Sequence, residues 1–321
     1  MRSTAIILSV AIVLSASLLL IHKWDKRHGS LWENLDNDNR QTIRYNEQWY
    51  VLRDELETVL VMGLDKFETD ESLDSYNNSM QADFLMLMVL DKDNDSVTAL
   101  HLNRDAMAQI DILGLDGETV GTFNGQLALA HTYGSGGKDS CKNTVKAVSN
   151  FLYEVPIDHY ISVTMDAVQT LNDLVGGVKV EVLDDFTGID ESLKKGEEVT
   201  LRGQQALTYV RTRKDLEDSS NAHRMKRQQQ YMTALYQRIG ESVEQDEGFI
   251  TDAAVKLADY MVSDCTVNQL ERIADFIAEN KVGEIRTVEG ESKLGEKFIE
   301  FYPDEASLQA LIIEMFFEPK K

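Results

Sequence analysis

Positive charge is scarce in this sequence. Its 321 residues include 32 lysines and arginines against 55 aspartates and glutamates, which gives a formal net charge of -23 at pH 7. A nucleic-acid duplex is bound through a broad basic surface that displaces counterions, so this composition excludes nucleic acid as a general partner. An anionic substrate would have to be held by a local cluster of positive charge that overcomes the field of the whole chain.

Cysteine and proline are also rare, with two and three residues respectively. Cys141 and Cys265 lie far apart and match no paired metal-ligand spacing such as C-x-x-C. They are expected either as two packed thiols or as one disulfide, and a chain of this length does not depend on a disulfide for its stability. The sequence contains no Walker-type glycine-rich loop and no nucleophile motif, so covalent catalysis is not supported.

One apolar run, Ala5–Ile21, stands near the N-terminus between Arg2 and the basic stretch His22–Arg27. Its length is at the short limit for a transmembrane helix, which leaves the core of a signal peptide as the alternative. We expect a retained membrane anchor over residues 1–22, because no small-residue cleavage site follows the run. The flanking charges do not settle the orientation of the anchor.

A polar segment without apolar periodicity follows the anchor and is expected to be a stalk over residues 23–49. Folded structure is expected to begin near Tyr50 and to form one domain over residues 50–318. With 43% hydrophobic residues, a chain of this length can bury a sizeable core.

Short apolar runs alternate with amphipathic segments in this part of the chain. The runs have the composition of strands that are buried on both faces of a sheet, and the amphipathic segments have that of helices. The expected strands are Glu57–Leu64, Phe84–Leu90, Val97–Leu102, Ile161–Thr164, Val178–Val182 and Thr208–Arg211. The expected helices are Asn143–Tyr153, Asp166–Val175, Gly203–Leu207, Asn221–Ser242 (capped by Ser219, Ser220 or Asn221), Thr266–Glu279 and Pro303–Phe317. This alternation predicts a layered α/β fold.

The few positive charges of the chain are densest in one segment, residues 211–227, which holds six lysines and arginines. Arg211 and Arg213 would alternate on a strand and face the same way, while Arg224 and Arg227 share a helix face. Four guanidiniums that converge would suit bidentate binding of phosphate oxygens. The alternative is a solvated surface on which these arginines pair with the neighbouring acids Asp215, Glu217 and Asp218.

Two carboxylates lie between the first two expected strands, where Asp65 ends the first strand and Asp83 opens the second. Carboxylates at one edge of a sheet can hold Mg²⁺ through oxygen ligands, although the same residues are common in ordinary turns. Arg104 and Asp105 follow the third strand and are expected near the same edge, where open α/β folds place their sites.

The order of these motifs resembles the LytR-CpsA-Psr family, the wall-glycopolymer ligases of Gram-positive bacteria, from about Glu57 to Phe317. The matching segments are Gly63–Asp65, Asp83, Asn103–Asp105, Tyr133–Gly134, Val155–Tyr160, Leu174–Val178, Leu201–Leu207, Tyr209–Arg213, Arg224–Gln228 and Tyr302–Asp304. The arginine-rich segments in this order are the most specific part of the resemblance.

The resemblance implies a three-layer α/β/α sandwich with a central mixed sheet, anchored by one N-terminal transmembrane helix and exposed on the extracytoplasmic side of the cell membrane. It also implies metal ligands at Asp65 and Asp83, with Mg²⁺ or alternatively Mn²⁺ as cofactor. Residues that match the diphosphate-contacting positions of the family are Arg104, Arg211, Arg213, Arg224 and Gln228, with Arg227 as a second basic position in the same helix.

Several positions depart from the pattern of the family. Asn103 replaces the usual proline, His223 replaces a glycine, and Gln126 and Ala128 replace a lysine and an asparagine. Loss of the lysine removes one phosphate contact that the resemblance would otherwise imply.

The activity implied is phosphoryl transfer. A phosphoryl-glycopolymer, of the teichoic acid or capsule type, would pass from a polyprenyl-pyrophosphate carrier to a hydroxyl of peptidoglycan. Arg104, Asp105, Arg211 and Arg213 are the candidate catalytic residues, with Asp105 as the base, and the helix Asp166–Val175 is expected to form one side of an apolar slot for the polyprenyl tail. The alternatives are a non-catalytic module that binds polyprenyl pyrophosphate, a cell-envelope regulator, and a pyrophosphatase that uses water as its acceptor.

Overall fold

The computed structural model describes residues 34–35, 40–64, 81–213, 215–280 and 282–320. The predicted membrane anchor lies outside these ranges. Within them, no helix is both long enough and apolar enough to cross a membrane. The described chain divides into two compact units, one formed by residues up to Asp54 together with Ile312–Lys321 and the other by Glu55–Leu311.

The smaller unit contains one sheet with the strand order β1-β2-β3-β16. These strands are Asn34–Leu35, Gln41–Tyr45, Gln48–Leu52 and Phe317–Pro319. Ile43 and Val51 are buried in it. Regular structure therefore begins before Tyr50, where the start of the fold was predicted. Strands β2 and β3 are short and bury one apolar residue each, so they show little periodicity in the sequence.

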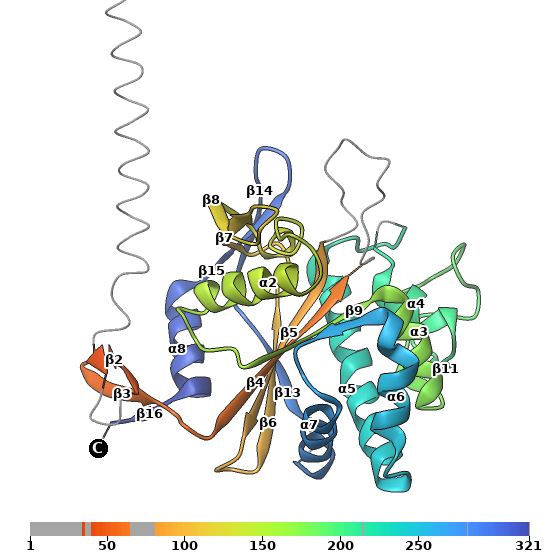
Figure 1. Ribbon diagram of the computed structural model, residues 1–321. Coiled ribbons are helices and arrows are strands. Elements are labelled where there is room, and N and C mark those ends of the chain that lie inside the picture. Colours follow the sequence, from red (N-terminus) through yellow and green to blue (C-terminus); the bar gives the residue numbers. More distant parts are fainter. Residues whose placement is uncertain (1–33, 36–39, 65–80, 214, 281, 321) are drawn as a thin grey trace, which may run out of the picture. The chain divides into compact units, whose positions relative to one another are not determined.

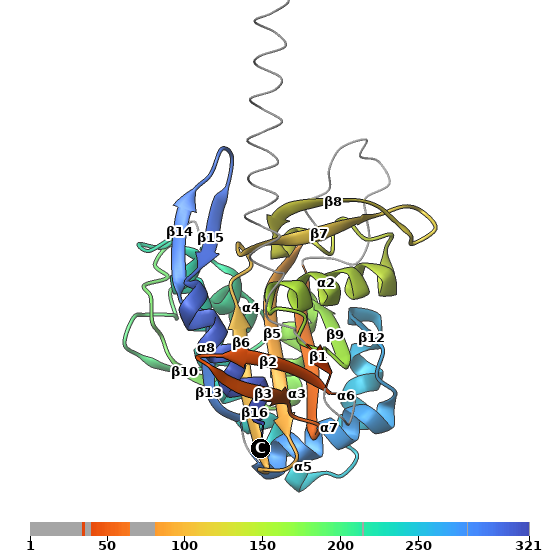
Figure 2. The same ribbon diagram turned by 90° about the vertical axis from the view of Figure 1, so that its left-hand side faces the viewer.

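The larger unit is built on a six-stranded sheet with the order β12-β9-β4-β5-β6-β13 (Figures 1 and 2). Its strands are Met261–Ser263, His159–Thr164, Leu56–Leu64, Ala82–Asp91, Ser96–Leu102 and Val282–Thr287, in that order. The pairs β4 with β9 and β6 with β13 are parallel, whereas the other three pairs are antiparallel. The sheet is mixed, as predicted.

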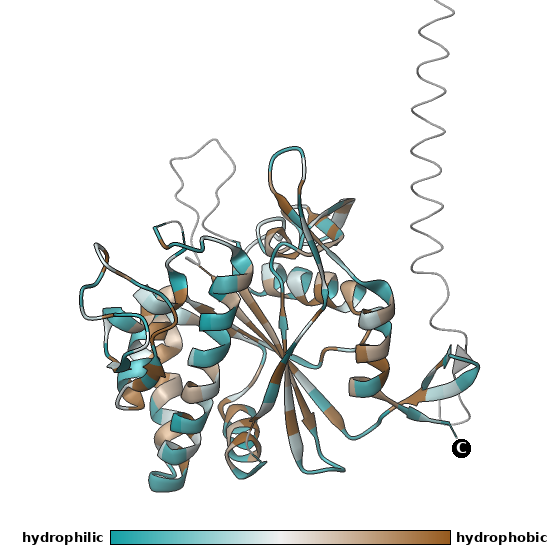
Figure 3. Cartoon of the chain, turned by 180° about the vertical axis from the view of Figure 1, so that it is seen from behind, coloured by the Kyte–Doolittle hydropathy of each residue, from teal (hydrophilic) through white to brown (hydrophobic). Residues whose placement is uncertain are grey.

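Both faces of this sheet are covered by helices. Met86 and Met88 of β5 belong to one apolar cluster with Ile273 of α7 (Val267–Asn280), and Met232 of α5 (Asn221–Gln245) packs against it. On the opposite face, Ser162 of β9 is fully buried against Cys141 of α2 (Gly137–Phe151). In Figure 3, hydrophobic segments run along the central strands. Neighbouring residues of β5 are buried on both sides, which explains its nearly continuous apolar sequence.

The described chain contains several further elements. They are the hairpins β7–β8 (Met107–Leu113, Thr119–Gln126), β10–β11 (Val178–Glu181, Glu198–Leu201) and β14–β15 (Gly290–Leu294, Ile299–Pro303), the helices α3 (Met165–Leu174), α4 (Gln204–Arg211), α6 (Phe249–Leu257) and α8 (Glu305–Phe316), and the 3-10 turns η2 (Leu127–Leu129) and η3 (Ala258–Tyr260). The sequence predicted that Pro303 starts the last helix. In the structure Pro303 instead ends β15, and the helix begins at Glu305.

Candidate functional site

The loop after β6 carries the first arginine of the site. The Nη1 atom of Arg104 forms an ion pair with Asp83 of β5, and its Nη2 atom donates to Oε1 of Gln81 at 2.7 Å. Its Nε atom lies 3.4 Å from Oδ1 of Asp105. The pairing of β5 with β6 ends at Leu85 and Leu102, so these contacts hold the guanidinium just beyond the ends of the two strands, at that edge of the sheet. Arg104, Asp83 and Asp105 therefore lie together, as the sequence predicted.

A second arginine, Arg224, comes from the first turns of α5. Ser220 caps this helix by accepting from the backbone N–H of His223 at 3.1 Å. The Nη2 atom of Arg224 donates to Oδ1 of Asn221 at 2.5 Å, and Nδ2 of Asn221 donates to Oδ1 of Asn103 at 2.9 Å. The start of α5 is thereby joined to the loop that carries Arg104.

Arg224 lies in an environment of excess positive charge. Only 7% of the residue is exposed. Burial, followed by the nearby charges of Arg104 and Arg213, lowers its pKa to about 10, against a smaller opposite effect of Asp105. Its Nε atom is buried and has no hydrogen-bond partner among the described residues. The three guanidiniums thus converge on one place where an anion would relieve their mutual repulsion.

Asp105 is the carboxylate of this cluster and is 5% exposed. Burial raises its pKa above the usual range of an aspartate, although the arginines Arg104, Arg224 and Arg213 each act in the opposite direction. Its Oδ1 atom accepts from Nε2 of Gln126 at 3.1 Å. A buried carboxylate with a raised pKa beside an anion site is suited to accept a proton.

Arg211 and Arg213 do not alternate on a strand, because residues 204–211 form helix α4. The prediction of a strand at Thr208–Arg211 was wrong. Ala206, Tyr209 and Val210 are buried at helical spacing, and this packing overrides the β-branched and aromatic composition of the segment. Arg211 is the exposed last residue of α4, and Arg213, half-buried, follows it.

Arg227, one turn after Arg224, is engaged entirely with the protein and is 0% exposed. Its Nε atom donates to the carbonyl of Tyr209 at 3.0 Å, its Nη1 atom pairs with Asp184, and its Nη2 atom donates to the carbonyl of Thr212. The ring of Phe186 covers the guanidinium at 5.7 Å. This geometry favours a supporting role for Arg227, which holds the end of α4 in place, over the predicted contact with a diphosphate.

The alternative that these helix arginines pair with Asp215, Glu217 and Asp218 does not describe the structure. The partners are Asn221 for Arg224 and Asp184 for Arg227.

One of the two predicted metal ligands can be placed. Asp65 lies outside the described residues, whereas the side chain of Asp83 is 18% exposed beside Arg104. A carboxylate oxygen is the type of ligand that Mg²⁺ prefers, so Asp83 fits the predicted cation in its chemistry. The arginine contact also keeps this carboxylate at the edge of the sheet.

An apolar cavity of about 210 Å³ lies beneath the arginines. Its walls come from strands β4, β5, β9 and β12 and from helices α3, α4, α5 and α6. The lining residues are Val61, Gly63, Phe84, Ile161, Val163, Thr164, Met165, Ala167, Val168, Leu171, Val210, Gln228, Tyr231, Met232, Leu235, Tyr236, Ile239, Leu257 and Met261. The helix predicted at Asp166–Val175, observed as α3, does form one wall of an apolar cavity, and its use by a polyprenyl tail stays a prediction.

The cavity begins next to the arginine cluster. Gln228 lines it and follows Arg224 by one helical turn, so the two side chains lie on one face of α5. Phe84 also lines it and packs against His101, with ring centroids 4.9 Å apart. Burial lowers the pKa of His101 to about 3, and the charge of Arg224 contributes to that shift. The site therefore joins a cluster of arginines to an apolar cavity.

Sequence reasoning missed Asn221 and Asp184. Asn221 is the first residue of α5, and its position before Arg224 could have indicated that it holds that arginine. Asp184 gave no comparable signal. Gln126, noted only as a replacement for a lysine, proves to hold Asp105.

Comparison with known proteins gives a consistent result. The LytR_cpsA_psr family model matches residues 20–314 of the chain. TagV of Bacillus subtilis (strain 168), a polyisoprenyl-teichoic acid–peptidoglycan teichoic acid transferase, is 30% identical over 240 residues, which cover 73% of this chain and 51% of that protein. TagU of the same organism is 28% identical over 196 residues, covering 61% and 55%. The chain thus spans about half the length of these curated relatives.

Solved structures share the fold. The crystal structure of B. subtilis TagV superposes with a TM-score of 0.62 at 24% identity and covers 82% of this chain and 97% of that one. Protein gbs0355 of Streptococcus agalactiae gives a TM-score of 0.65 at 16% identity, with 81% and 86% covered.

Proposed function

The chain belongs to the LytR-CpsA-Psr family, and from that premise we propose that it transfers a phosphoryl-glycopolymer from a polyprenyl-pyrophosphate carrier to a hydroxyl of peptidoglycan. The observation that carries the proposal is the junction between the arginine cluster and the apolar cavity. A diphosphate and a long apolar tail, joined in one molecule, need these two environments side by side. Relatives named as teichoic acid transferases support the same class of reaction.

The cluster of Arg104, Arg213 and Arg224 would bind the diphosphate. Their charges offset the negative charge of the phosphate oxygens, and the buried position of Arg224 strengthens the interaction because water screens it less. Arg211, exposed at the end of α4, would reach the same anion from the solvent side. Gln228 would mark the point where the tail enters the cavity.

In the reaction, the acceptor hydroxyl attacks the phosphorus that carries the polymer sugar. The bond between this phosphorus and the bridging oxygen breaks, and polyprenyl phosphate leaves with the bonding electron pair. Asp105 would take the proton of the hydroxyl, and its contact with Arg104 would keep the carboxylate near the bound diphosphate. The arginines stabilise the charge as it moves to the leaving oxygen.

We further propose Mg²⁺ as the cofactor, with Mn²⁺ as the alternative, bound by Asp83 and Asp65. When bound, the cation would neutralise diphosphate charge that the arginines do not reach. We also propose that residues 1–22 anchor the chain as a single-pass protein with its domain on the extracytoplasmic side. Such an anchor would raise the local concentration of a lipid-borne substrate.

The test is to incubate the full-length chain with a short-chain polyprenyl-pyrophosphate saccharide and a peptidoglycan oligomer, with Mg²⁺ or chelator. We expect polyprenyl phosphate to be released and the saccharide to be joined to the oligomer. Arg224→Gln, Arg211→Ala and Asp83→Ala should each reduce both products. Lys226→Ala, an exposed position on the same helix, is the matched control and should leave them unchanged.

Three outcomes separate the alternatives. Release of polyprenyl phosphate without joining would show a pyrophosphatase, and tight binding without release would show a binding module. Either result would overturn the ligase, and equal activity of Arg224→Gln and wild type would overturn the site.

A further inference from the structure

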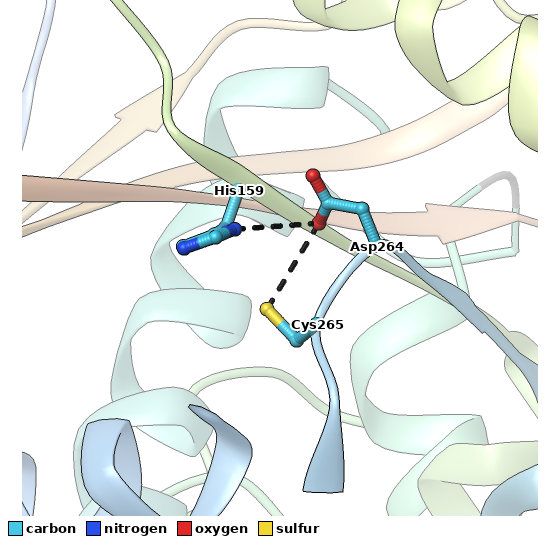
Figure 4. A group of neighbouring side chains, drawn as sticks. All are labelled: His159, Asp264 and Cys265. Atoms are coloured by element: carbon cyan, nitrogen blue, oxygen red, sulfur yellow. Dashed lines mark hydrogen bonds and ion pairs between the residues drawn. The ribbon is translucent and has the colours of Figure 1, made fainter. Parts of the chain in front are cut away.

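A second group of potential ligand atoms lies at the far end of β9. His159 is the first residue of this strand, and Asp264 and Cys265 form the link between β12 and α7. Figure 4 shows the three side chains directed toward one another, although His159 and Cys265 are more than one hundred residues apart in the sequence. One ligand atom from each of the three residues lies within 4.8 Å of the other two.

The spacing of these atoms matches a tetrahedral metal site. Nδ1 of His159 lies 3.7 Å from Oδ1 of Asp264, and Sγ of Cys265 lies 3.9 Å from the same oxygen. Zinc bonds to nitrogen, oxygen and sulfur of about 2.0–2.3 Å place neighbouring tetrahedral ligands roughly 3.3–3.8 Å apart. Small movements of side chains would therefore complete three of the four corners.

The surrounding groups hold the three side chains in this arrangement. Oδ1 of Asp264 accepts from the backbone N–H of Tyr160 at 2.9 Å, and the backbone N–H of Cys265 donates to Oγ of Ser263 at 3.0 Å. Among the described residues, the buried Nδ1 atom of His159 has no hydrogen-bond partner. It therefore points at the other two ligands without a committed partner of its own.

The other ring nitrogen of His159 has a suitable outer contact. Nε2 lies 3.6 Å from a carboxylate oxygen of Glu57 and 3.4 Å from the Gln269 amide. A carboxylate that accepts a hydrogen bond from Nε2–H would leave Nδ1 as the metal ligand, which is the usual outer arrangement of a histidine that binds zinc. Glu57 itself is held by Arg272, with 2.7 Å between Oε1 and Nη2.

We propose that His159, Asp264 and Cys265 bind one divalent transition metal of the zinc type, with a fourth position open to water. A neutral imidazole, a carboxylate and a thiolate together offset the two positive charges of the ion. The mixed nitrogen, oxygen and sulfur set favours zinc over Mg²⁺, which prefers oxygen alone. Binding requires the thiolate, so the Cys265 proton is released to solvent.

This site is separate from the arginine cluster. Thr164, at the other end of β9, lines the apolar cavity, and five residues of extended strand span roughly 17 Å. The metal would fasten the edge strand β12 and the start of α7 to β9, so its contribution would be to stability. The two cysteines are both free, and Cys141 packs on the opposite face of the sheet.

The experiment is a titration of the reduced full-length chain with Zn²⁺ in competition with a chromophoric chelator, followed by replacement with Co²⁺. We expect one ion per chain, a thiolate-to-cobalt charge-transfer band, and a higher thermal midpoint with Zn²⁺ than with chelator. Cys265→Ser should abolish the band, and His159→Gln and Asp264→Asn should weaken Zn²⁺ binding at least about tenfold.

Cys141→Ser is the matched control because it removes the other thiol, and it should keep the band and the stoichiometry. Arg224→Gln should also bind Zn²⁺ normally, since it changes only the distant site. Circular dichroism of each variant verifies that it is folded. A band that persists in Cys265→Ser, or a folded wild-type chain that binds no stoichiometric Zn²⁺, would overturn the proposal.

Discussion

Arg224 and Arg227 lie one turn apart on α5, are both buried, and nevertheless have opposite surroundings. Arg227 forms contacts with Asp184 and with two carbonyl groups, so its charge is neutralised within the protein. Arg224 is close to Arg104 and Arg213, and its guanidinium donates a hydrogen bond to the neutral amide of Asn221. The comparison shows that burial alone does not identify a binding arginine. The balance of the neighbouring charges does.

The largest expected effect is the loss of stability in Arg227→Met. The substitution removes the arginine partner of the buried Asp184, whose other oxygen is left with its contact to Nδ1 of His223, and it frees two backbone carbonyls. We therefore expect a loss of about 3–5 kcal/mol in the free energy of unfolding. Denaturant titration of Arg227→Met beside Arg224→Met measures the difference. Equal destabilisation of the two variants would remove the distinction between them.

The next effect is on turnover. Arg224→Gln should lower the rate of polyprenyl phosphate release about 10²–10³-fold, as expected when one donor to a developing charge is removed. Its stability should stay near that of the wild type or rise, because a buried charge repelled by two others is removed. A normal rate in Arg224→Gln would contradict the assignment of the anion site.

The dependence of the rate on pH tests the role of Asp105, the carboxylate next to Arg224. Asp105 must be ionised to act as a base, and burial raises its pKa. The rate should therefore fall about tenfold per pH unit below that raised pKa, beginning at a higher pH than an ordinary aspartate would give. Protonation of a group with a raised folded-state pKa favours the folded state, so unfolding does not explain this fall. An unchanged acid limb in a slow Asp105→Asn variant would assign it to another group.

The smallest effect is the response to inorganic pyrophosphate. At ten times its dissociation constant, a ligand that binds only the folded state stabilises it by about 1.4 kcal/mol. In thermal unfolding, pyrophosphate should raise the midpoint of the wild type. The rise should be smaller for Arg213→Gln. Stabilisation that survives in both Arg213→Gln and Arg224→Gln would place the anion elsewhere.

The sequence allowed much of the central sheet to be predicted. Strands β4, β5 and β6 are nearly continuous apolar runs, because helices cover both of their faces. Such a run can be recognised from neighbouring residues of the sequence without knowledge of distant contacts. Helix α5 was predicted because its capping residues and the following apolar periodicity are adjacent in the sequence, and the structure selects Ser220 from the three candidate caps. Arg104 and Asp83 could be placed together because each lies next to the end of a predicted strand.

The parts that were missed depend on contacts distant in the sequence. The β7–β8 hairpin has a mostly exposed second strand, so its apolar signal is weak. α4 was divided into a helix and a strand because its second half contains Thr208, Tyr209 and Val210, which favour strands when packing is unknown. The sequence alone could not distinguish Arg227 from Arg224, since Asp184 lies forty-three residues before it.

The apolar cavity has a consequence for the whole catalytic cycle. If it holds the polyprenyl tail, it holds the same tail before and after the reaction, because substrate and product share it. Such uniform binding secures the carrier but does not lower the barrier of the chemical step. The spent carrier would therefore compete with the loaded one for the enzyme, and the rate at which it returns to the bilayer would set an upper limit on the cycle.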